Sequence, residues 1–275
     1  MPWIRGVLLA TACLTMQSTG HAAAIFSVAA ATSAGIQTTV DAFRTDLGSL
    51  NANVAGSFGS GRREINWDGV PDASSAPNNL PANFFNVNSP RGVVFATSGT
   101  GFQVSANAAS GTLIEFGNIN ATYPDLFTTF SSPRLFTALG STITDVPFFI
   151  PGTTTGALTR GFGAVFTDVD LANTTSLEFF DANNNSLGTF FVPSLTGNQT
   201  LEFLGVDFGS AIVSRVRITS GNSVLGPNED ATHDLVVMDD FIYGEPVPVP
   251  EPTSLALLTT GLAAVALARR RRKIT

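Results

Sequence analysis

Apolar residues follow a helical spacing in one segment near the N-terminal end, residues 33–50. They recur at intervals of four, three, four and three residues: Ile36, Val40, Phe43, Leu47 and Leu50. This spacing places all five on one face of a helix, and Thr32 or Ser33 is available as its N-cap. The pattern predicts an amphipathic helix of about four turns that packs against a larger body.

Beyond Leu50 the helical spacing gives way to short apolar runs separated by Gly, Asn, Pro, Ser and Asp. Runs of this kind, at intervals of roughly ten residues, are typical of β-sandwiches and barrels. We expect about nine strands, at residues 93–97, 102–106, 113–116, 163–169, 177–180, 189–192, 201–208, 212–219 and 235–243. Twenty-two phenylalanines supply bulk for a two-sheet core. The prediction is a mostly β chain with a single antiparallel β-sandwich over residues 51–244, preceded by one helix.

The N-terminal residues 1–24 have the organisation of a signal peptide. Arg5 supplies the charged region, residues 6–16 form an apolar run, and Ala22 and Ala24 form a small-x-small cleavage site. We expect export through the Sec translocon and cleavage by signal peptidase after Ala24. Residues 25–50 then form an N-terminal helical segment.

The C-terminal end carries a second set of signals. Residues 245–252 form a Pro-rich linker, and the apolar residues 253–268 reach only ~24 Å as a helix, against a hydrocarbon core of ~30 Å. We therefore predict a short transmembrane helix. The basic tail, residues 269–275, includes five consecutive cations: Arg269, Arg270, Arg271, Arg272 and Lys273. These cations place the tail in the cytoplasm and everything before the helix outside.

Pro250-Glu251-Pro252, the apolar stretch and the arginine cluster together resemble the sorting tail of PEP-CTERM proteins. The resemblance implies export in a Gram-negative bacterium and recognition by an exosortase that cuts near the motif. The protein would then pass through an inner-membrane-anchored intermediate to the cell surface or the extracellular matrix. Such proteins resemble components of polysaccharide-rich envelopes and biofilm matrix.

Three stretches of the body are also similar to exported PEP-CTERM proteins: residues 61–70, 161–166 and 238–243. The bodies of those proteins look like jelly-roll, carbohydrate-module sandwiches. The resemblance therefore implies a jelly-roll sandwich and an extracellular protein, and it implies no particular activity.

Charge and residue types exclude several functions. Residues 25–250 contain eight arginines, no lysine and twenty acidic residues, a formal net charge of −12. This charge repels phosphate backbones, so we expect no nucleic-acid partner, whereas divalent cations and neutral sugars are compatible with it. The same residues contain no Cys and a single His, His233, which excludes disulfides, thiol nucleophiles, Ser-Lys pairs and multi-His zinc sites.

A loop rich in acids and amides is a candidate calcium site. Asp68, Asp72 and Asn78 lie on a Pro-rich segment, and Asp239 or Asp240 could complete their oxygen ligands from a distance. Alternatively, the loop uses Asp and Asn only for turns. Calcium is the one cofactor that the sequence predicts.

A sugar-binding edge is a second hypothesis. Trp67 would stack on a pyranose ring while Arg63 and Glu64 bind its hydroxyls. The alternative is a buried Trp67 covered by an Arg-Glu pair.

Two further pairs of residues include acidic side chains. Asp168 and Asp170 share one face of a strand, where they repel unless a cation or Arg160 lies between them, although a plain strand-end pair also explains them. His233 and Asp234 are expected to form a surface pair.

No carboxylate pair stands out by its spacing, so no catalytic residue is named. The favoured hypothesis is a non-catalytic cell-surface or extracellular-matrix protein that binds exopolysaccharide. The alternative is a carbohydrate-active hydrolase that uses a carboxylate pair. Enzymatic activity is thus left open.

Overall fold

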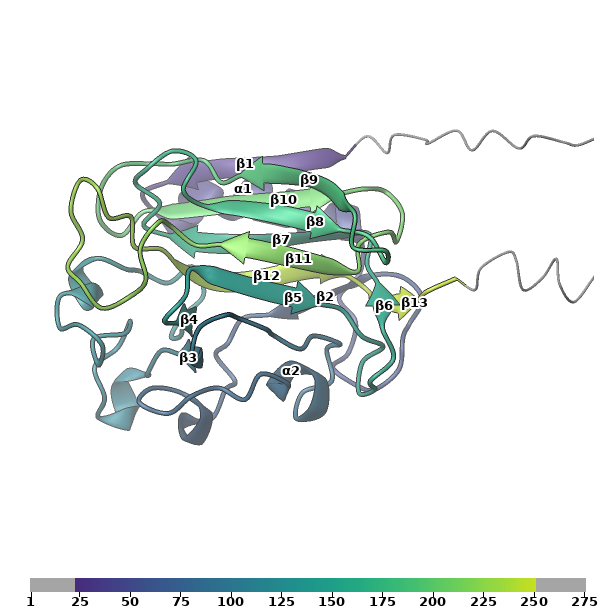
Figure 1. The fold of residues 1–275 in the computed structure, drawn as a ribbon, viewed down its shortest axis with the longest axis horizontal. Helices are drawn as coiled ribbons and strands as arrows, with labels where there is room; N and C mark the ends of the chain where they lie inside the picture. The colour runs from purple at the N-terminus through teal and green to yellow at the C-terminus, as the bar shows by residue number, and fades with distance from the viewer. Residues whose placement is uncertain (1–22, 251–275) are drawn as a thin grey trace, which may run out of the picture.

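The computed structural model describes residues 23–250, and most of its regular structure is antiparallel β-sheet (Figure 1). The larger sheet has seven strands, in the order β1-β10-β7-β12-β4-β3, with β2 also paired to β12. Their bounds are β1 Ala24–Ala30, β2 Arg62–Ile65, β3 Gly101–Val104, β4 Phe136–Leu139, β7 Gly161–Thr167, β10 Leu201–Asp207 and β12 Val237–Gly244. The mostly β class predicted from the sequence is confirmed.

A second sheet of four strands lies over the first, in the order β5-β11-β8-β9 (Figure 1). Its strands are β5 Ile143–Pro147, β8 Ser176–Phe180, β9 Ser186–Phe191 and β11 Arg215–Thr219. A two-stranded sheet pairs β6 Ala157–Leu158 with β13 Val247–Pro248. Short helices interrupt the long connections: α2 Phe84–Val87 and the 3-10 turns η1 Asp72–Ser74, η2 Ala108–Ser110 and η3 Tyr123–Asp125.

The main core lies between the two sheets. Phe162, Phe166 and Leu204 of the larger sheet pack in one cluster with Phe179 and Val216 of the smaller sheet. These side chains alternate along their strands with residues of the opposite face, as the period of two requires. Burial of such large apolar side chains is the main force that holds the sheets together.

The predicted N-terminal helix is present as α1, Ser33–Leu47, and it covers the outer face of the larger sheet. Its side chains Ile36, Val40, Phe43 and Leu47 are buried against Val165, Leu201, Phe203 and Ile242. The Thr32 hydroxyl accepts a hydrogen bond from the Gly35 amide at 3.3 Å, so Thr32 is the N-cap. Leu50 lies beyond the helix and is exposed.

The β-sheets include more of the chain than the sequence indicated. Residues 25–30, expected to belong to the N-terminal helical segment, lie in β1, which pairs with β10 at the edge of the larger sheet. The expected linker begins inside the fold, because Glu245 is buried and Val247 pairs with Leu158.

Two of the expected strands are wrong. Residues 113–116 cannot be extended, because Glu115 and Phe116 have φ values of 50° and 62°. Residues 93–97 form only isolated bridges, Val93 with Phe148 and Ala96 with Asp145.

No helix among residues 23–250 is long and apolar enough to cross a membrane. The helix expected at residues 253–268, the cation cluster and most of the signal peptide lie outside the described residues.

Candidate functional site

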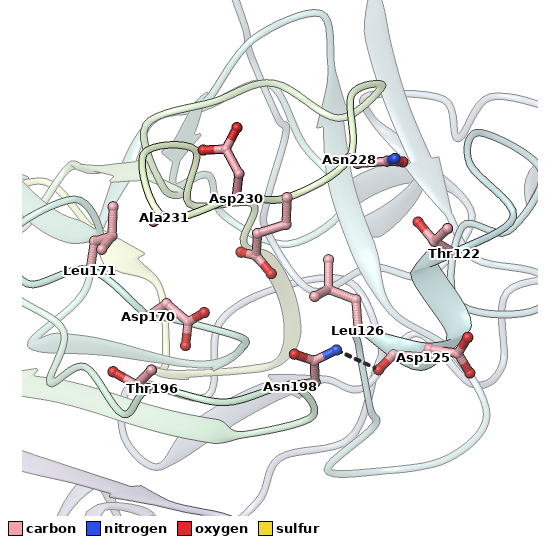
Figure 2. Close-up of a pocket in the computed structure, with 11 residues that line it drawn as sticks. Thr122, Asp125, Leu126, Asp170, Leu171, Thr196, Asn198, Asn228, Asp230 and Ala231 are labelled. Carbon is pink, nitrogen blue, oxygen red and sulfur yellow. Dashed lines mark hydrogen bonds between the residues drawn. The ribbon is translucent and has the colours of Figure 1, made fainter.

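A cavity of about 570 Å³ opens beside η3, between the segment that follows β7 and the loop that precedes β12 (Figure 2). Most of its lining residues carry an oxygen or amide group; they are Thr122, Asp125, Leu126, Asp170, Leu171, Thr196, Asn198, Asn228, Glu229, Asp230 and Ala231. Apolar atoms nevertheless form the larger part of the lining surface. A cavity of this size is in the range of small-molecule sites, and its lining is suited to hydroxyl groups or cations.

Asp168 lies directly beside this cavity, at the point where β7 ends. Its φ of 72° turns the chain out of the strand, and its amide donates a hydrogen bond to the Thr200 carbonyl at 3.2 Å. The Asp168 side chain is completely buried, and no N–H or O–H group in the described part of the chain donates a hydrogen bond to either carboxylate oxygen. A buried charge without partners is costly, so this side chain needs an explanation.

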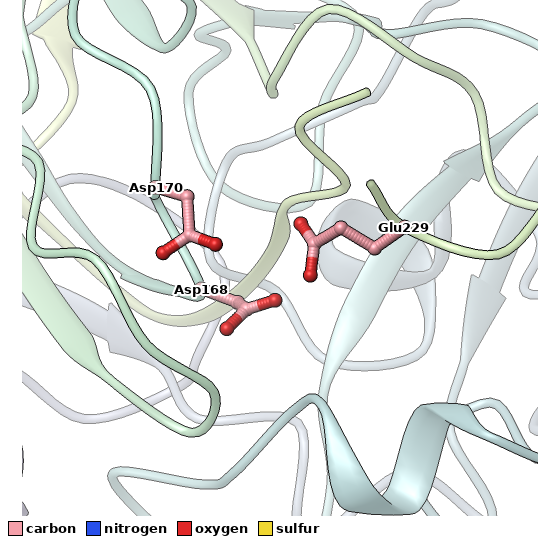
Figure 3. A group of neighbouring side chains, drawn as sticks. All are labelled: Asp168, Asp170 and Glu229. Atoms are coloured by element: carbon pink, nitrogen blue, oxygen red, sulfur yellow. The ribbon is translucent and has the colours of Figure 1, made fainter. Parts of the chain in front are cut away.

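Asp170 and Glu229 bring two more carboxylates to Asp168 (Figure 3). One oxygen from each of the three side chains lies within 4.8 Å of the other two. Asp170 Oδ1 accepts a hydrogen bond from the Gly197 amide at 2.8 Å, and Glu229 Oε1 accepts one from the Leu235 amide at 3.3 Å. The backbone therefore orients both side chains toward Asp168.

The surroundings of this cluster are acidic too. Glu202 of β10 is buried, and within residues 23–250 its side chain accepts one hydrogen bond, from the Val169 amide at 3.3 Å. Asp234 is buried and accepts a hydrogen bond from the Asp170 amide at 3.0 Å. Among residues 23–250, no Arg or His forms an ion pair with Asp168, Asp170, Glu202, Glu229 or Asp234.

The electrostatic consequence is a strong preference for neutral carboxyl groups or for a bound positive charge. Burial, followed by the negative charge of Glu229, raises the pKa of Asp168 far above its usual range. Burial likewise raises the pKa of Glu202 to about 8 and that of Glu229 to about 6. Desolvation disfavours the ionised form of each acid, and the neighbouring acids add repulsion.

Only part of this cluster was visible in the sequence. The sequence allows Asp168 and Asp170 to be either a plain strand-end pair or a pair with a cation or Arg160 between them. Arg160 is not that partner, because it binds Asp207 and lies 3.6 Å from Asp46. Glu229 comes from a distant loop, and no spacing in the sequence connects it to β7.

The residues predicted to bind calcium do not converge. The Asp72 carboxylate binds Arg134 at 2.6 Å, and Asn78 donates to the Asp72 carbonyl at 3.3 Å. Asp239 accepts hydrogen bonds from the amides of Phe130 and Ser131.

Asp68 and Asp240, the remaining two of the predicted calcium ligands, lie near each other. Asp240 binds Arg44 at 3.1 Å, and Asp68 has a pKa raised to about 6, first by burial and then by the charge of Asp240. Guanidinium groups thus already neutralise Asp72 and Asp240. In the described part of the chain, the convergence of three metal-binding side chains occurs at Asp168, Asp170 and Glu229 instead.

The predicted sugar-binding edge is buried. Trp67 is 1% exposed, stacks on Phe136 with ring centroids 4.1 Å apart, and donates its Nε1 hydrogen to the Asp239 carbonyl at 2.9 Å. Arg63 is also buried and pairs with Glu245. Glu64 pairs with Arg44 and Arg62. The prediction is corrected because the aromatic face contacts core side chains and has no access to a ligand.

His233 does not pair with Asp234 as expected. Its Nδ1 lies 2.7 Å from a carboxylate oxygen of Asp230, at the surface, whereas Asp234 points inward to Thr174 and the Asp170 amide.

The PEP-CTERM protein-sorting motif matches residues 248–272, which confirms the resemblance found in the sequence. No curated protein matches the chain.

Among solved structures, the chain is similar to the enzymatically active domain of tailspike protein 4 from bacteriophage CBA120. The identity is 13%, the TM-score is 0.28, and the match covers 60% of this chain and 20% of that chain. The chain therefore spans a fifth of the length of the tailspike chain, and the similarity is too weak to transfer a fold or an activity.

Proposed function

Starting from the PEP-CTERM protein-sorting motif that makes this chain an exported protein targeted to the cell surface, we propose that its β-sandwich is a non-catalytic module that binds exopolysaccharide. The sandwich would be displayed at the cell surface or in the extracellular matrix. A jelly-roll, carbohydrate-module type of sandwich is part of this proposal, and the two packed sheets support it.

The route to the surface follows from the two ends of the chain. Export through the Sec translocon and cleavage by signal peptidase would leave an intermediate anchored in the inner membrane by residues 253–268. An exosortase recognises the sorting motif and would release the folded module from this anchor.

The observation that carries the binding proposal is the lining of the cavity. Side chains of Thr122, Thr196, Asn198 and Asn228 offer hydrogen-bond donors and acceptors to sugar hydroxyls. Asn228 Oδ1 accepts a hydrogen bond from Asn120 Nδ2 at 2.8 Å, and Asn198 Nδ2 donates to the Asp125 carbonyl at 3.1 Å, so both amides are held in place (Figure 2). The acidic surroundings favour a neutral glycan over an anionic one.

The test uses the mature exported protein on a glycan array and on the exopolysaccharide of its host. We expect binding that falls at least tenfold in Asn198→Ala and Asn228→Ala. Asn53→Ala, an exposed asparagine outside the cavity, is the matched control and should leave binding unchanged. Absence of binding by the wild-type protein, or equal losses in all three variants, would contradict the proposal.

A carbohydrate-active hydrolase is the second candidate, because the same cavity is lined by four carboxylates, those of Asp125, Asp170, Glu229 and Asp230. Glycoside hydrolysis needs two carboxyl groups on either side of the bond to be cleaved. A reducing-sugar assay on the exopolysaccharide distinguishes the two functions. Sustained release that is lost in Asp170→Asn or Glu229→Gln would establish the hydrolase, and binding without release supports the module. If the protein shows no binding and no sugar release, it is a purely structural matrix component.

A further inference from the structure

The acidic cluster beside the cavity combines two independent observations. Three carboxylates from two segments far apart in the sequence converge, with one oxygen of each within 4.8 Å of the others. In addition, Asp168 is completely buried, and both of its oxygens lack any hydrogen-bond partner among the described residues. Convergence alone is common among surface acids. A buried carboxylate with both oxygens free, directed at two other carboxylates, indicates a missing positive ligand.

We propose that Asp168, Asp170 and Glu229 form a calcium-binding site between β7 and the loop that precedes β12. Calcium binds hard oxygen ligands, and the cluster offers only carboxylates. Its Ca–O distances of about 2.3–2.6 Å put opposite ligands about 4.6–5.2 Å apart, which accommodates the separations found here. The open side toward the cavity leaves room for water or ligand oxygens to complete the coordination.

The surrounding hydrogen bonds support this assignment. Gly197 and Leu235 each use a backbone amide to bind one oxygen, of Asp170 and of Glu229 respectively, and the other oxygen of each side chain remains available. The Asp234 carboxylate accepts a hydrogen bond from the Asp170 amide and so fixes the backbone of Asp170. Contacts of this kind orient metal ligands before the metal arrives.

The site is different from the loop in which the sequence suggested calcium. Asp72 and Asp240 have guanidinium partners, whereas Asp168, Asp170 and Glu229 have none in residues 23–250. The proposal is also independent of glycan binding, because the cation would join two distant segments of the fold whether or not a sugar occupies the cavity.

The experiment measures calcium binding by the mature exported protein after removal of metal with EDTA. Extracellular calcium sites bind at ~10⁻⁴ to 10⁻³ M, so calorimetric titration should show one site in this range. The melting temperature should rise by several degrees in 10 mM CaCl₂ and return in EDTA. MgCl₂ at the same concentration should give a smaller shift.

Variants locate the site. Asp170→Asn and Glu229→Gln should each weaken calcium binding at least tenfold and remove most of the rise in melting temperature. Asp72→Asn, in the loop predicted from the sequence, is the matched control and should leave both measurements unchanged. Asp168→Asn removes one of the three proposed ligands and should show no response to calcium.

Three outcomes would overturn the proposal. The first is no calcium binding by the wild type up to 10 mM. The second is calcium binding that survives Asp170→Asn and Glu229→Gln but not Asp72→Asn. The third combines two results: the wild type gives no calcium response, and the variants at all three positions have higher melting temperatures than the wild type in EDTA. That combination would indicate that the carboxyl groups share protons. Because Asp170 and Glu229 are only partly buried, their variants remain informative if Asp168→Asn does not fold.

Discussion

Arg63 is a charged side chain inside the fold, and its guanidinium group donates hydrogen bonds to several identified acceptors. It is completely buried and forms a two-bond pair with Glu245, with nitrogen to oxygen distances of 2.8 and 2.9 Å. Its remaining hydrogen bonds go to the carbonyls of Val54, Gly56 and Pro90. One guanidinium group therefore connects β2 to the segment after β12 and to two loops.

Replacing Arg63 should therefore be severe. Arg63→Met leaves the buried Glu245 carboxylate without its charged partner and with only the hydrogen bonds from Asn51 and the Phe58 amide. Loss of one partner of a buried ion pair costs about 3–5 kcal/mol of unfolding free energy. Arg217→Ala is the control, because Arg217 pairs with Asp145 near the surface and is 42% exposed. We expect a loss of about 0–1 kcal/mol there. Urea denaturation measures both, and similar losses in the two variants would show that Arg63 is not a structural tie.

The carboxyl group of Glu115 should make the stability of the folded protein depend on pH. Burial raises its pKa to about 7, so the folded protein binds a proton that the unfolded chain releases at lower pH. Stability is therefore full below the unfolded value near pH 4.5 and falls as the pH rises toward 7.

The corresponding variant is Glu115→Gln. Between pH 5 and pH 8, the wild type should lose about 1–2 kcal/mol of unfolding free energy relative to this variant. The expected loss is small because the Glu115 side chain is partly exposed, and solvent screens its charge. Urea denaturation at both pH values measures the difference, and the other acids cancel in the comparison. A constant difference across this range would contradict the raised pKa.

At the scale of elements, helix α1 approaches the larger sheet where two strands carry glycine. Gly163 of β7 and Gly205 of β10 are direct partners in the sheet, and the ring of Phe43 rests on both. A Cβ atom at Gly205 would lie 2.9 Å from two ring carbons of Phe43. The glycines therefore set how close the helix can lie.

Gly205→Ala should push the helix outward. Overpacking of this kind costs about 1–3 kcal/mol, and the cost should appear as lower thermal stability and faster amide exchange in α1. Gly156→Ala is the control, because a Cβ atom there meets nothing within 4 Å. Unchanged exchange in α1 of Gly205→Ala would mean that Phe43 can move aside without disturbing the helix.

At the scale of the whole molecule, the folded body extends almost to the sorting motif. Strand β13 ends at Pro248, and the motif matches residues 248–272. At the other end, β1 begins at Ala24 and pairs with β10 from its first residue. The processing that we expect at either end would therefore take place directly beside structured chain.

Processing can be followed by intact mass and N-terminal sequencing. The exported protein should begin at Ile25 or within two residues of it, because the small-x-small site ends at Ala24 and a cut there leaves most of β1 paired with β10. In a host with an exosortase, the cations Arg269 to Lys273 should be absent from the mature protein. In a host without one, they should remain, with the protein held in the inner membrane. Equal persistence of the tail in both hosts would count against sorting by exosortase.

The sequence by itself determined the features that rest on local patterns. Periodicity identified α1 and its apolar face, alternation and turn residues indicated a mostly β body, and the motif with its basic tail identified a sorted, exported protein. Each of these signals lies within a few neighbouring residues, so no knowledge of distant contacts is needed to read it.

Only the tertiary structure decided which residues form sites. The sequence favoured a buried Trp67 but left a sugar-binding edge open, and its burial and its stacking on Phe136 place it in the core. Asp168 and Asp170 were visible as an unbalanced pair, yet Glu229 reaches them only because the loop before β12 folds back over the end of β7. Long-range strand pairing brings such residues together, and pairing between distant strands leaves no periodic trace in the local sequence.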